Sequence, residues 1–156
     1  MTLADFTKPG LTVPHLHGRD AAGVIHELST ELQREGCVAD WLPFYHEALN
    51  REFLLSTDLE ADLAIPHARV PEVQRLAFAF GRSDHPVVWG PQITHPVRLI
   101  FLLALPLTDR EPRLTLISGV ARLVANPNLL ETLRGAVDSA AIMAVFRNVD
   151  LRGLGP

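Results

Sequence analysis

Residues 97–105 read Val97-Arg98-Leu99-Ile100-Phe101-Leu102-Leu103-Ala104-Leu105, and this stretch decides the fold class. A run this apolar is typical of a central strand that is covered on both faces. A second apolar run, residues 76–81, is followed by a polar turn predicted at Ser83-Asp84. Shorter apolar runs at residues 63–65 and 87–89 are further candidate strands. Together these runs predict a sheet in the middle of the chain.

Helical patterns flank this sheet on both sides in the sequence. Residues 20–35 carry apolar side chains at helical spacing, and Asp40 is a good cap for a second helix that reaches about residue 49. After the central strand, helices are predicted to begin near residues 111, 127 and 139. Helices, a sheet and helices again predict one α/β (mixed α+β) domain, in which helices flank a mixed sheet.

Composition excludes several classes of protein. The chain has 156 residues, of which 47% are hydrophobic and 21% charged, and this balance is that of a globular domain rather than a disordered chain. A net charge of -4 gives no basic footprint for nucleic acid. One cysteine allows no internal disulfide. No signal peptide or membrane span is evident, so we expect a cytoplasmic protein without stable membrane insertion.

The segment from Arg51 to Arg69 carries the most promising chemistry, because His67 follows Pro66 where an apolar run ends. A neutral imidazole can attack phosphorus with one ring nitrogen while the other is held by a hydrogen bond. The flanking cations and hydroxyls are groups that an incoming phosphoryl group needs, namely those of Arg51, Arg69, Ser56 and Thr57. No cofactor and no metal site is expected. Taken blind, a lone histidine of this kind is more often structural than catalytic.

A resemblance changes that balance. Ala64-Ile65-Pro66-His67, followed by Arg69, resembles the A-I-P-H-G-R phosphohistidine motif of the enzyme IIA family of the bacterial sugar phosphotransferase system, in its fructose, mannitol and nitrogen-regulatory branch. Arg51-Glu52 and Ser56-Thr57 are similar to the family's upstream segment, and the later strands and helices follow in its order. The resemblance covers residues 15–147, which leaves a lead-in at 1–18 and a flexible tail at 148–156.

The resemblance implies a mixed sheet of about five strands and a site in which His67 accepts a phosphoryl group from an HPr-like phosphocarrier protein. By position, Arg51 would steady that group. Sugar-branch members pass it to an enzyme IIB cysteine, whereas nitrogen-branch members regulate partner proteins according to their phosphorylation state. No transporter or IIB segment fits in 156 residues, which favours the standalone regulatory type.

The sequence departs from the family pattern at the site. Asp58, Glu60 and Asp62 stand in a segment that is glycine-rich in the family, and they oppose phosphorylation if they point at His67. Ala68 replaces the glycine after the histidine. Arg113 occupies the place where many members carry a second histidine, so it is a candidate to hold a phosphoryl oxygen. Two hypotheses therefore stay open: a phosphoryl carrier, or a binding module that keeps the fold and acts by protein contact or by holding a small anion.

Overall fold

The computed structural model describes residues 1–54, 58–59, 62–90, 96–108 and 110–153. Among these residues the sheet has six strands, in the order β1-β5-β6-β3-β2, and β4 also pairs with β6. The strands are β1 (Thr12–Val13), β2 (Asp58–Leu59), β3 (Leu63–Ala64), β4 (His67–Arg69), β5 (Ala77–Val87) and β6 (Val97–Leu105). The helices are α1 (Ala21–Arg34), α2 (Trp41–Leu54), α3 (Arg110–Val124), α4 (Pro127–Arg134) and α5 (Ser139–Arg147), with 3-10 turns η1 (Leu3–Phe6) and η2 (Pro9–Leu11).

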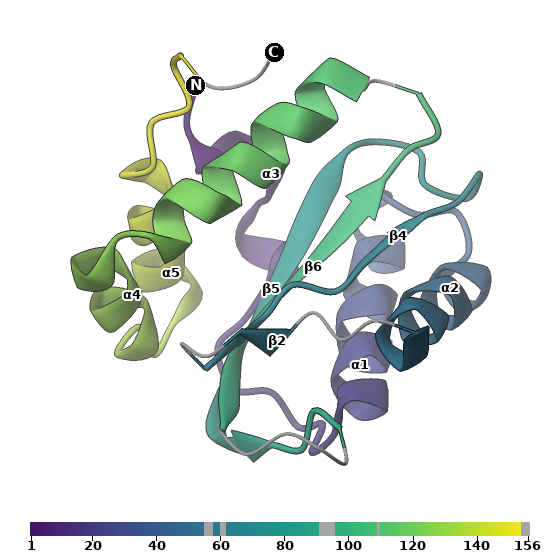
Figure 1. Ribbon diagram of the computed structural model, residues 1–156, viewed down its shortest axis with the longest axis horizontal. Helices are drawn as coiled ribbons and strands as arrows, with labels where there is room; N and C mark the ends of the chain where they lie inside the picture. The colour runs from purple at the N-terminus through teal and green to yellow at the C-terminus, as the bar shows by residue number, and fades with distance from the viewer. Residues whose placement is uncertain (55–57, 60–61, 91–95, 109, 154–156) are drawn as a thin grey trace.

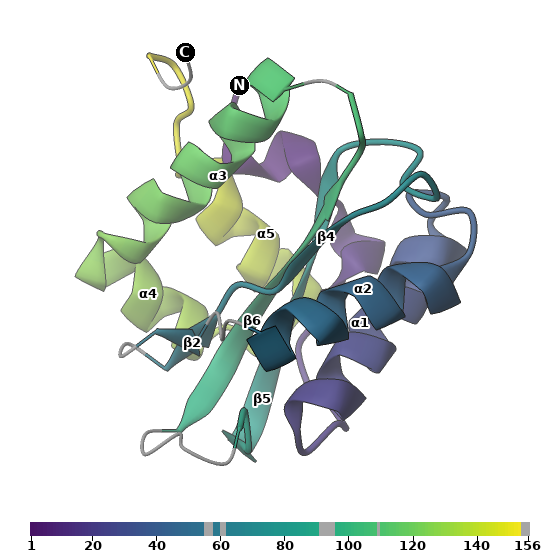
Figure 2. The ribbon, with the colours of Figure 1, turned by 45° about the vertical axis from the view of Figure 1, so that its right-hand side comes forward.

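The sheet is mixed and lies between two helical layers, as Figure 1 shows. β5 and β6 are antiparallel, whereas β3 and β4 run parallel to β6. α1 and α2 pack on one face, and α3, α4 and α5 lie on the other, as the turned view in Figure 2 makes clear. The predicted fold class, a mixed sheet flanked by helices, is therefore confirmed.

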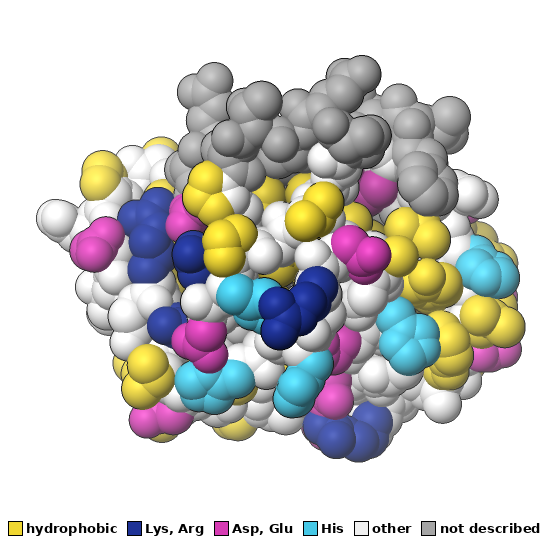
Figure 3. All heavy atoms as spheres, turned by 90° about the horizontal axis from the view of Figure 1, so that it is seen from below, with side chains coloured by type: hydrophobic (Ala, Val, Ile, Leu, Met, Phe, Trp, Pro, Cys, Tyr) yellow, Lys and Arg dark blue, Asp and Glu magenta, His cyan; other side chains and the backbone are white. Residues whose placement is uncertain are grey.

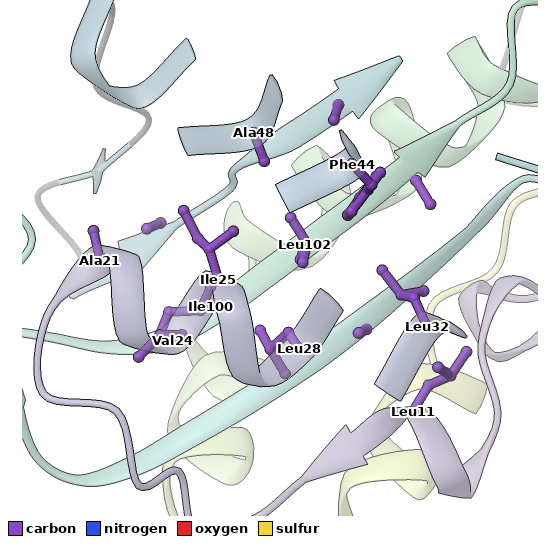
Figure 4. Close-up of a cluster of buried hydrophobic side chains, with 14 of the residues drawn as sticks. Leu11, Ala21, Val24, Ile25, Leu28, Leu32, Phe44, Ala48, Ile100 and Leu102 are labelled. Atoms are coloured by element: carbon purple, nitrogen blue, oxygen red, sulfur yellow. The ribbon is translucent and has the colours of Figure 1, made fainter. Parts of the chain in front are cut away.

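β6 is the central strand, and its side chains alternate between two buried clusters. Ile100 and Leu102 belong to the cluster under α1 and α2, while Phe101 and Leu103 belong to the cluster under the C-terminal helices. Figure 4 shows the first cluster, in which the side chains of α1 point toward Ile100 and Leu102. A strand that is buried on both faces cannot carry polar residues at alternate positions, which is why residues 97–105 are so uniformly apolar.

The helices begin where short polar side chains cap them. Asp20 accepts a hydrogen bond from the backbone nitrogen of Gly23, and Asp138 accepts one from that of Ala141. Asn126 caps α4, whose first residue is Pro127. These side chains satisfy backbone N–H groups that have no partner within the helix. The predicted helices near these positions are confirmed.

Three segments differ from the sequence-based expectation. The turn predicted at Ser83-Asp84 is wrong, because β5 continues through it to Val87, with a shift of register after Arg82. Residues 1–18 are not simply extended, since η1, η2 and β1 lie there and Leu3 and Leu11 are buried. In the expected tail, Val149 and Leu151 are buried against the body of the protein. Segments as short as η1, η2 and the residues after α5 show no periodicity, so a sequence pattern could not predict them.

Positively and negatively charged side chains share the surface. Figure 3 shows one face on which arginine or lysine, acidic and histidine side chains are interspersed. This mixture differs from the basic stripe of a nucleic-acid-binding surface. Within the described segments, no helix has the combination of length and apolarity that crossing a bilayer requires.

Candidate functional site

β3 and β4 form one interrupted strand beside β6, and this strand positions His67. Ala64 pairs with Ile100 and His67 pairs with Leu103, so the register along β6 is the same before and after the interruption. The interruption lies at Pro66, which has no N–H to donate, although its carbonyl still accepts a hydrogen bond from Leu103 at 2.9 Å. His67 is therefore the first residue of the strand that resumes after the proline.

The constant register also fixes the face on which the imidazole lies. Ala68 is buried in the cluster under α1 and α2, so His67 and Arg69, its neighbours in the strand, point to the opposite face. On that face Ile65 and Leu103 line an apolar groove of about 290 Å³, whose other wall is α3. His67 follows Ile65 on the same face, and β4 lies between α2 and α3 at the edge of the sheet (Figure 2).

The environment of His67 favours the neutral ring. Partial burial lowers the pKa of its imidazole below 6.5, and the nearby positive charge of Arg51 lowers the pKa further. A hydrogen bond to the backbone of Ile65 and the negative charge of Glu52 act in the opposite direction. A backbone group that raises the pKa of a histidine must be an acceptor, so one ring N–H donates to the carbonyl of Ile65. The other ring nitrogen then carries the lone pair of a neutral imidazole.

Arg51 and Glu52 come from the C-terminal end of α2. The Nε of Arg51 lies 3.4 Å from Oε1 of Glu47, and half of the Arg51 side chain is exposed, at 50%. Arg51 thus forms an ion pair with Glu47, one helical turn earlier. Glu52 accepts a hydrogen bond from Nε1 of Trp89 at 2.9 Å. An exposed arginine with a weak partner can turn its guanidinium toward a new anion at little cost.

The other two arginines of the predicted site lie on the α3 side. Arg69 is exposed, and its guanidinium donates to the carbonyl of Leu107 at 2.8 Å, just after β6. Arg113 lies one helical turn before Ile117, which lines the groove, so it extends the same face of α3. One guanidinium nitrogen of Arg113, NH1, is buried and has no hydrogen-bond partner within the described part of the chain. A buried N–H of a cation without an acceptor is costly, and an anion would satisfy it.

The remaining predicted site residues have different outcomes. Ser56, Thr57 and Glu60 lie outside the described residues, as does the side chain of Asp58. Asp62 is described, and its carboxylate is paired with Arg134 of α4, with Oδ1 3.0 Å from NH2 of the arginine. That pairing offsets the charge that would oppose an anion at the site if the carboxylate pointed at His67. Over the described segments, no group of three or more histidine, cysteine or acidic side chains could hold a metal ion.

Sequence reasoning missed two participants. Arg134 is far from His67 in the sequence, so no local pattern links the two. Glu52 was named only as part of the segment Arg51-Glu52, and Trp89 was assigned to a short strand. Nothing in the sequence predicts that the indole of Trp89 and the carboxylate of Glu52 meet.

Comparison with known proteins decides the family. Residues 5–149 match the sequence model of the family described as "Phosphoenolpyruvate-dependent sugar phosphotransferase system, EIIA 2". The chain belongs to this family. As an EIIA protein it has a phosphoryl-carrier or regulatory role in the phosphotransferase system, and the resemblance seen in the sequence is confirmed.

Individual relatives of the chain include nitrogen regulatory proteins. The EIIA chain is 28% identical to a nitrogen regulatory protein of Bradyrhizobium diazoefficiens over 94% of its own length and 95% of that protein's. It is 26% identical to a nitrogen regulatory protein of Pseudomonas aeruginosa, over 94% and 96% of the two lengths. The crystal structure of nitrogen regulatory protein IIA-Ntr from Neisseria meningitidis superposes with a TM-score of 0.80 at 25% identity, covering 92% of this chain and 98% of that one.

Proposed function

We propose that His67 is the phosphoryl acceptor of this EIIA protein and that an HPr-like phosphocarrier protein is the donor. The observation that carries the proposal is a half-buried imidazole whose pKa is lowered, with one ring nitrogen bonded to Ile65 and with Arg51 close enough to act on its charge. A nucleophile must offer a lone pair, and this environment supplies one at neutral pH.

The transfer itself is a displacement at phosphorus. The unprotonated ring nitrogen of His67 attacks the phosphorus of the carrier's phosphohistidine; a new N–P bond forms as the carrier's N–P bond breaks, and the carrier's imidazole leaves. No oxidant or further reactant is needed. The protein contributes position and charge stabilisation. Arg51 would balance the arriving dianion, with Arg69, Arg113, Ser56 and Thr57 as further phosphate-binding candidates.

The apolar groove supports a protein as the donor. Ile65, Leu103 and Ile117 present an apolar surface beside His67, and Leu107 is exposed at 47% near Arg69. A surface of this kind next to a reactive side chain suits the face of a second protein, because it buries apolar area on contact. After phosphorylation the chain would regulate a partner protein or pass the group to an enzyme IIB. We place this activity in the cytoplasm.

The test is incubation of the protein with phosphoenolpyruvate, enzyme I and the carrier, followed by detection of acid-labile, base-stable phosphate. We expect one phosphate per chain, and none in His67→Ala. His46→Ala is the matched control, since His46 is an exposed histidine on α2, and it should accept phosphate like the natural chain. Failure of several carriers to transfer phosphate to the natural chain would refute the proposal.

A second candidate function has one observation in its favour. The buried NH1 of Arg113 lacks an acceptor within the described residues, so the fold could instead hold a small anion and act by protein contact without transfer. Under that alternative, capture of a partner protein would be unchanged in His67→Ala and lost in Arg113→Gln. Loss of capture in His67→Ala would favour the phosphoryl carrier.

A further inference from the structure

Asp62 has an unusual backbone conformation immediately before the strand that carries His67. Its φ is 61°, and in the described part of the chain it is the non-glycine residue with a positive φ. Aspartate visits this left-handed region more readily than most residues but still at a cost in free energy. A conformation of this kind persists only where the surrounding contacts hold it.

Two sets of contacts hold Asp62. Its backbone carbonyl accepts hydrogen bonds from the nitrogens of Arg98 at 2.9 Å and Leu99 at 3.1 Å, which ties it to the start of β6. Its carboxylate accepts from Nε of Arg134 at 3.0 Å and from NH2 of the same guanidinium at 3.0 Å. This is a two-pronged arginine–carboxylate contact, which fixes orientation as well as distance.

The ion pair is shielded from water and is itself supported. The side chains of Asp62 and Arg134 are only 16% and 33% exposed. The hydrogen bond to Asp62 raises the pKa of Arg134, so the guanidinium stays charged. Arg134 also contacts Glu131 at 3.2 Å, and its backbone carbonyl accepts from Nε of Arg82 in β5 at 2.7 Å. The end of α4 is thus bonded to the sheet at Arg134, the residue that binds the carboxylate of Asp62.

The pair matters for His67 because it adds to the bonds that hold the start of the strand carrying this residue. Leu63 and Ala64 pair with β6, but Pro66 can donate no hydrogen bond. A slip of one residue in this strand would turn His67 to the opposite face, away from the groove and α3. The register of this strand therefore depends on its start at Asp62 as well as on its pairs with β6.

We propose that Arg134 and Asp62 form a latch that positions His67: the ion pair holds Asp62 in its left-handed conformation and thereby helps to set the register of β3 and β4. Both are positioning residues, since they act on the reaction through the strand and touch no reacting atom. Of the two measurements below, only the rate of phosphoryl acceptance rests on the proposed function, whereas the NMR shifts of the His67 ring do not. In this proposal Asp62, which would oppose phosphorylation if it pointed at His67, supports it through its pairing with Arg134.

The experiment compares Asp62→Asn, Arg134→Gln and the double variant with the natural chain. Arg147→Gln is the matched control, because Arg147 is an exposed arginine at the end of α5. Two quantities are measured: the rate of phosphoryl acceptance from the carrier, and the NMR chemical shifts of the His67 ring in the unphosphorylated protein. Thermal unfolding shows that each variant is folded; if Asp62→Asn fails to fold, Asp62→Gly replaces it, since glycine reaches positive φ freely.

We expect each single variant to accept phosphate about tenfold more slowly or worse, the size of effect that a misplaced reacting group produces. The ring signals of His67 should move in both, and the double variant should be no worse than the slower single variant. Folded single variants with natural rates and unmoved ring signals would overturn the latch. So would opposite effects, with Asp62→Asn faster and Arg134→Gln slower, because these indicate an effect of charge alone. If the natural chain accepts no phosphate, the proposed function fails, and the ring signals still decide the latch.

Discussion

The indole Nε1 of Trp89 donates a hydrogen bond to Oε2 of Glu52 at 2.9 Å. This contact joins the end of α2 to the segment that follows β5, and it holds the carboxylate whose charge raises the pKa of His67. Arg51, the next residue along α2, acts on the same imidazole in the opposite direction. The end of one helix thus presents both signs of charge to the candidate nucleophile.

The two charges can be separated by mutation. In Arg51→Ala the positive charge that lowers the pKa of His67 is removed, so that pKa should rise. In Glu52→Gln the negative charge that raises it is removed, so the pKa should fall further. NMR titration of the His67 ring measures both, and the ring signal of His46 in the same spectra serves as an internal reference. Shifts in the same direction in both variants would contradict this arrangement of charge.

Phosphoryl acceptance should depend on pH in a defined direction. The folded protein lowers the pKa of His67 from its ordinary value, so the neutral ring predominates at pH 7 and above, and the rate of acceptance should change little between about pH 7 and 8. It should fall only as the pH drops through the lowered pKa. Single-turnover rates with a pre-phosphorylated carrier measure this, with a second EIIA protein as a control for the carrier's own titration. A midpoint at or above 6.5 would rule out the neutral-ring environment.

Trp89→Phe should destabilise the fold. The variant loses the hydrogen bond to Glu52 and leaves a small gap at a side chain that is only 4% exposed, so we expect a loss of about 1–3 kcal/mol in the free energy of unfolding. Urea denaturation measures it. Trp41→Phe is the control, since Trp41 is only half-buried, and it should cost less. Equal costs would show that the hydrogen bond contributes nothing.

The cap of α5 offers a test that is independent of the site. Asp138→Ala removes the acceptor for the backbone nitrogen of Ala141, so the free energy of unfolding should fall by about 1 kcal/mol. Asp138→Asn keeps a good capping side chain and should lose much less. Thermal or urea unfolding distinguishes the two, and similar losses in both would show that the negative charge, rather than the cap, is the important property.

The parts of the fold that could be predicted are those fixed by local chemistry. Residues 97–105 are a strand with those same bounds, because burial on both faces leaves no choice of residue type. α4 begins after Asn126 at Pro127 and ends at Arg134, before Gly135, because cap, proline and glycine are local signals. The parts that could not be predicted depend on pairing. β4 has only the residues His67–Arg69, too few for any period, and exists because β6 lies beside it.

The candidate site likewise has one part that the sequence predicts and one part that it does not. His67 and Arg51 stand in a recognisable motif, and in the structure the charge of Arg51 lies near enough to lower the pKa of His67. The role of Asp62 could not be judged from the sequence, because it depends on Arg134, which arrives from a helix that follows the whole sheet. A carboxylate near a phosphoryl site opposes or supports the chemistry according to its partner, and the partner is set by tertiary structure alone.

The first and last residues of the folded body are bonded to each other. Leu3 donates a backbone hydrogen bond to the carbonyl of Val149 at 3.0 Å, and Leu151 donates one to that of Met1 at 3.0 Å. Residues 1–3 and 149–151 therefore lie side by side, near the N-terminus marked in Figure 1. A short peptide could therefore connect them, and the protein could be reopened at an exposed loop elsewhere as a circular permutant. A carrier of this kind could be spliced into another polypeptide through its paired ends while its sheet stays intact.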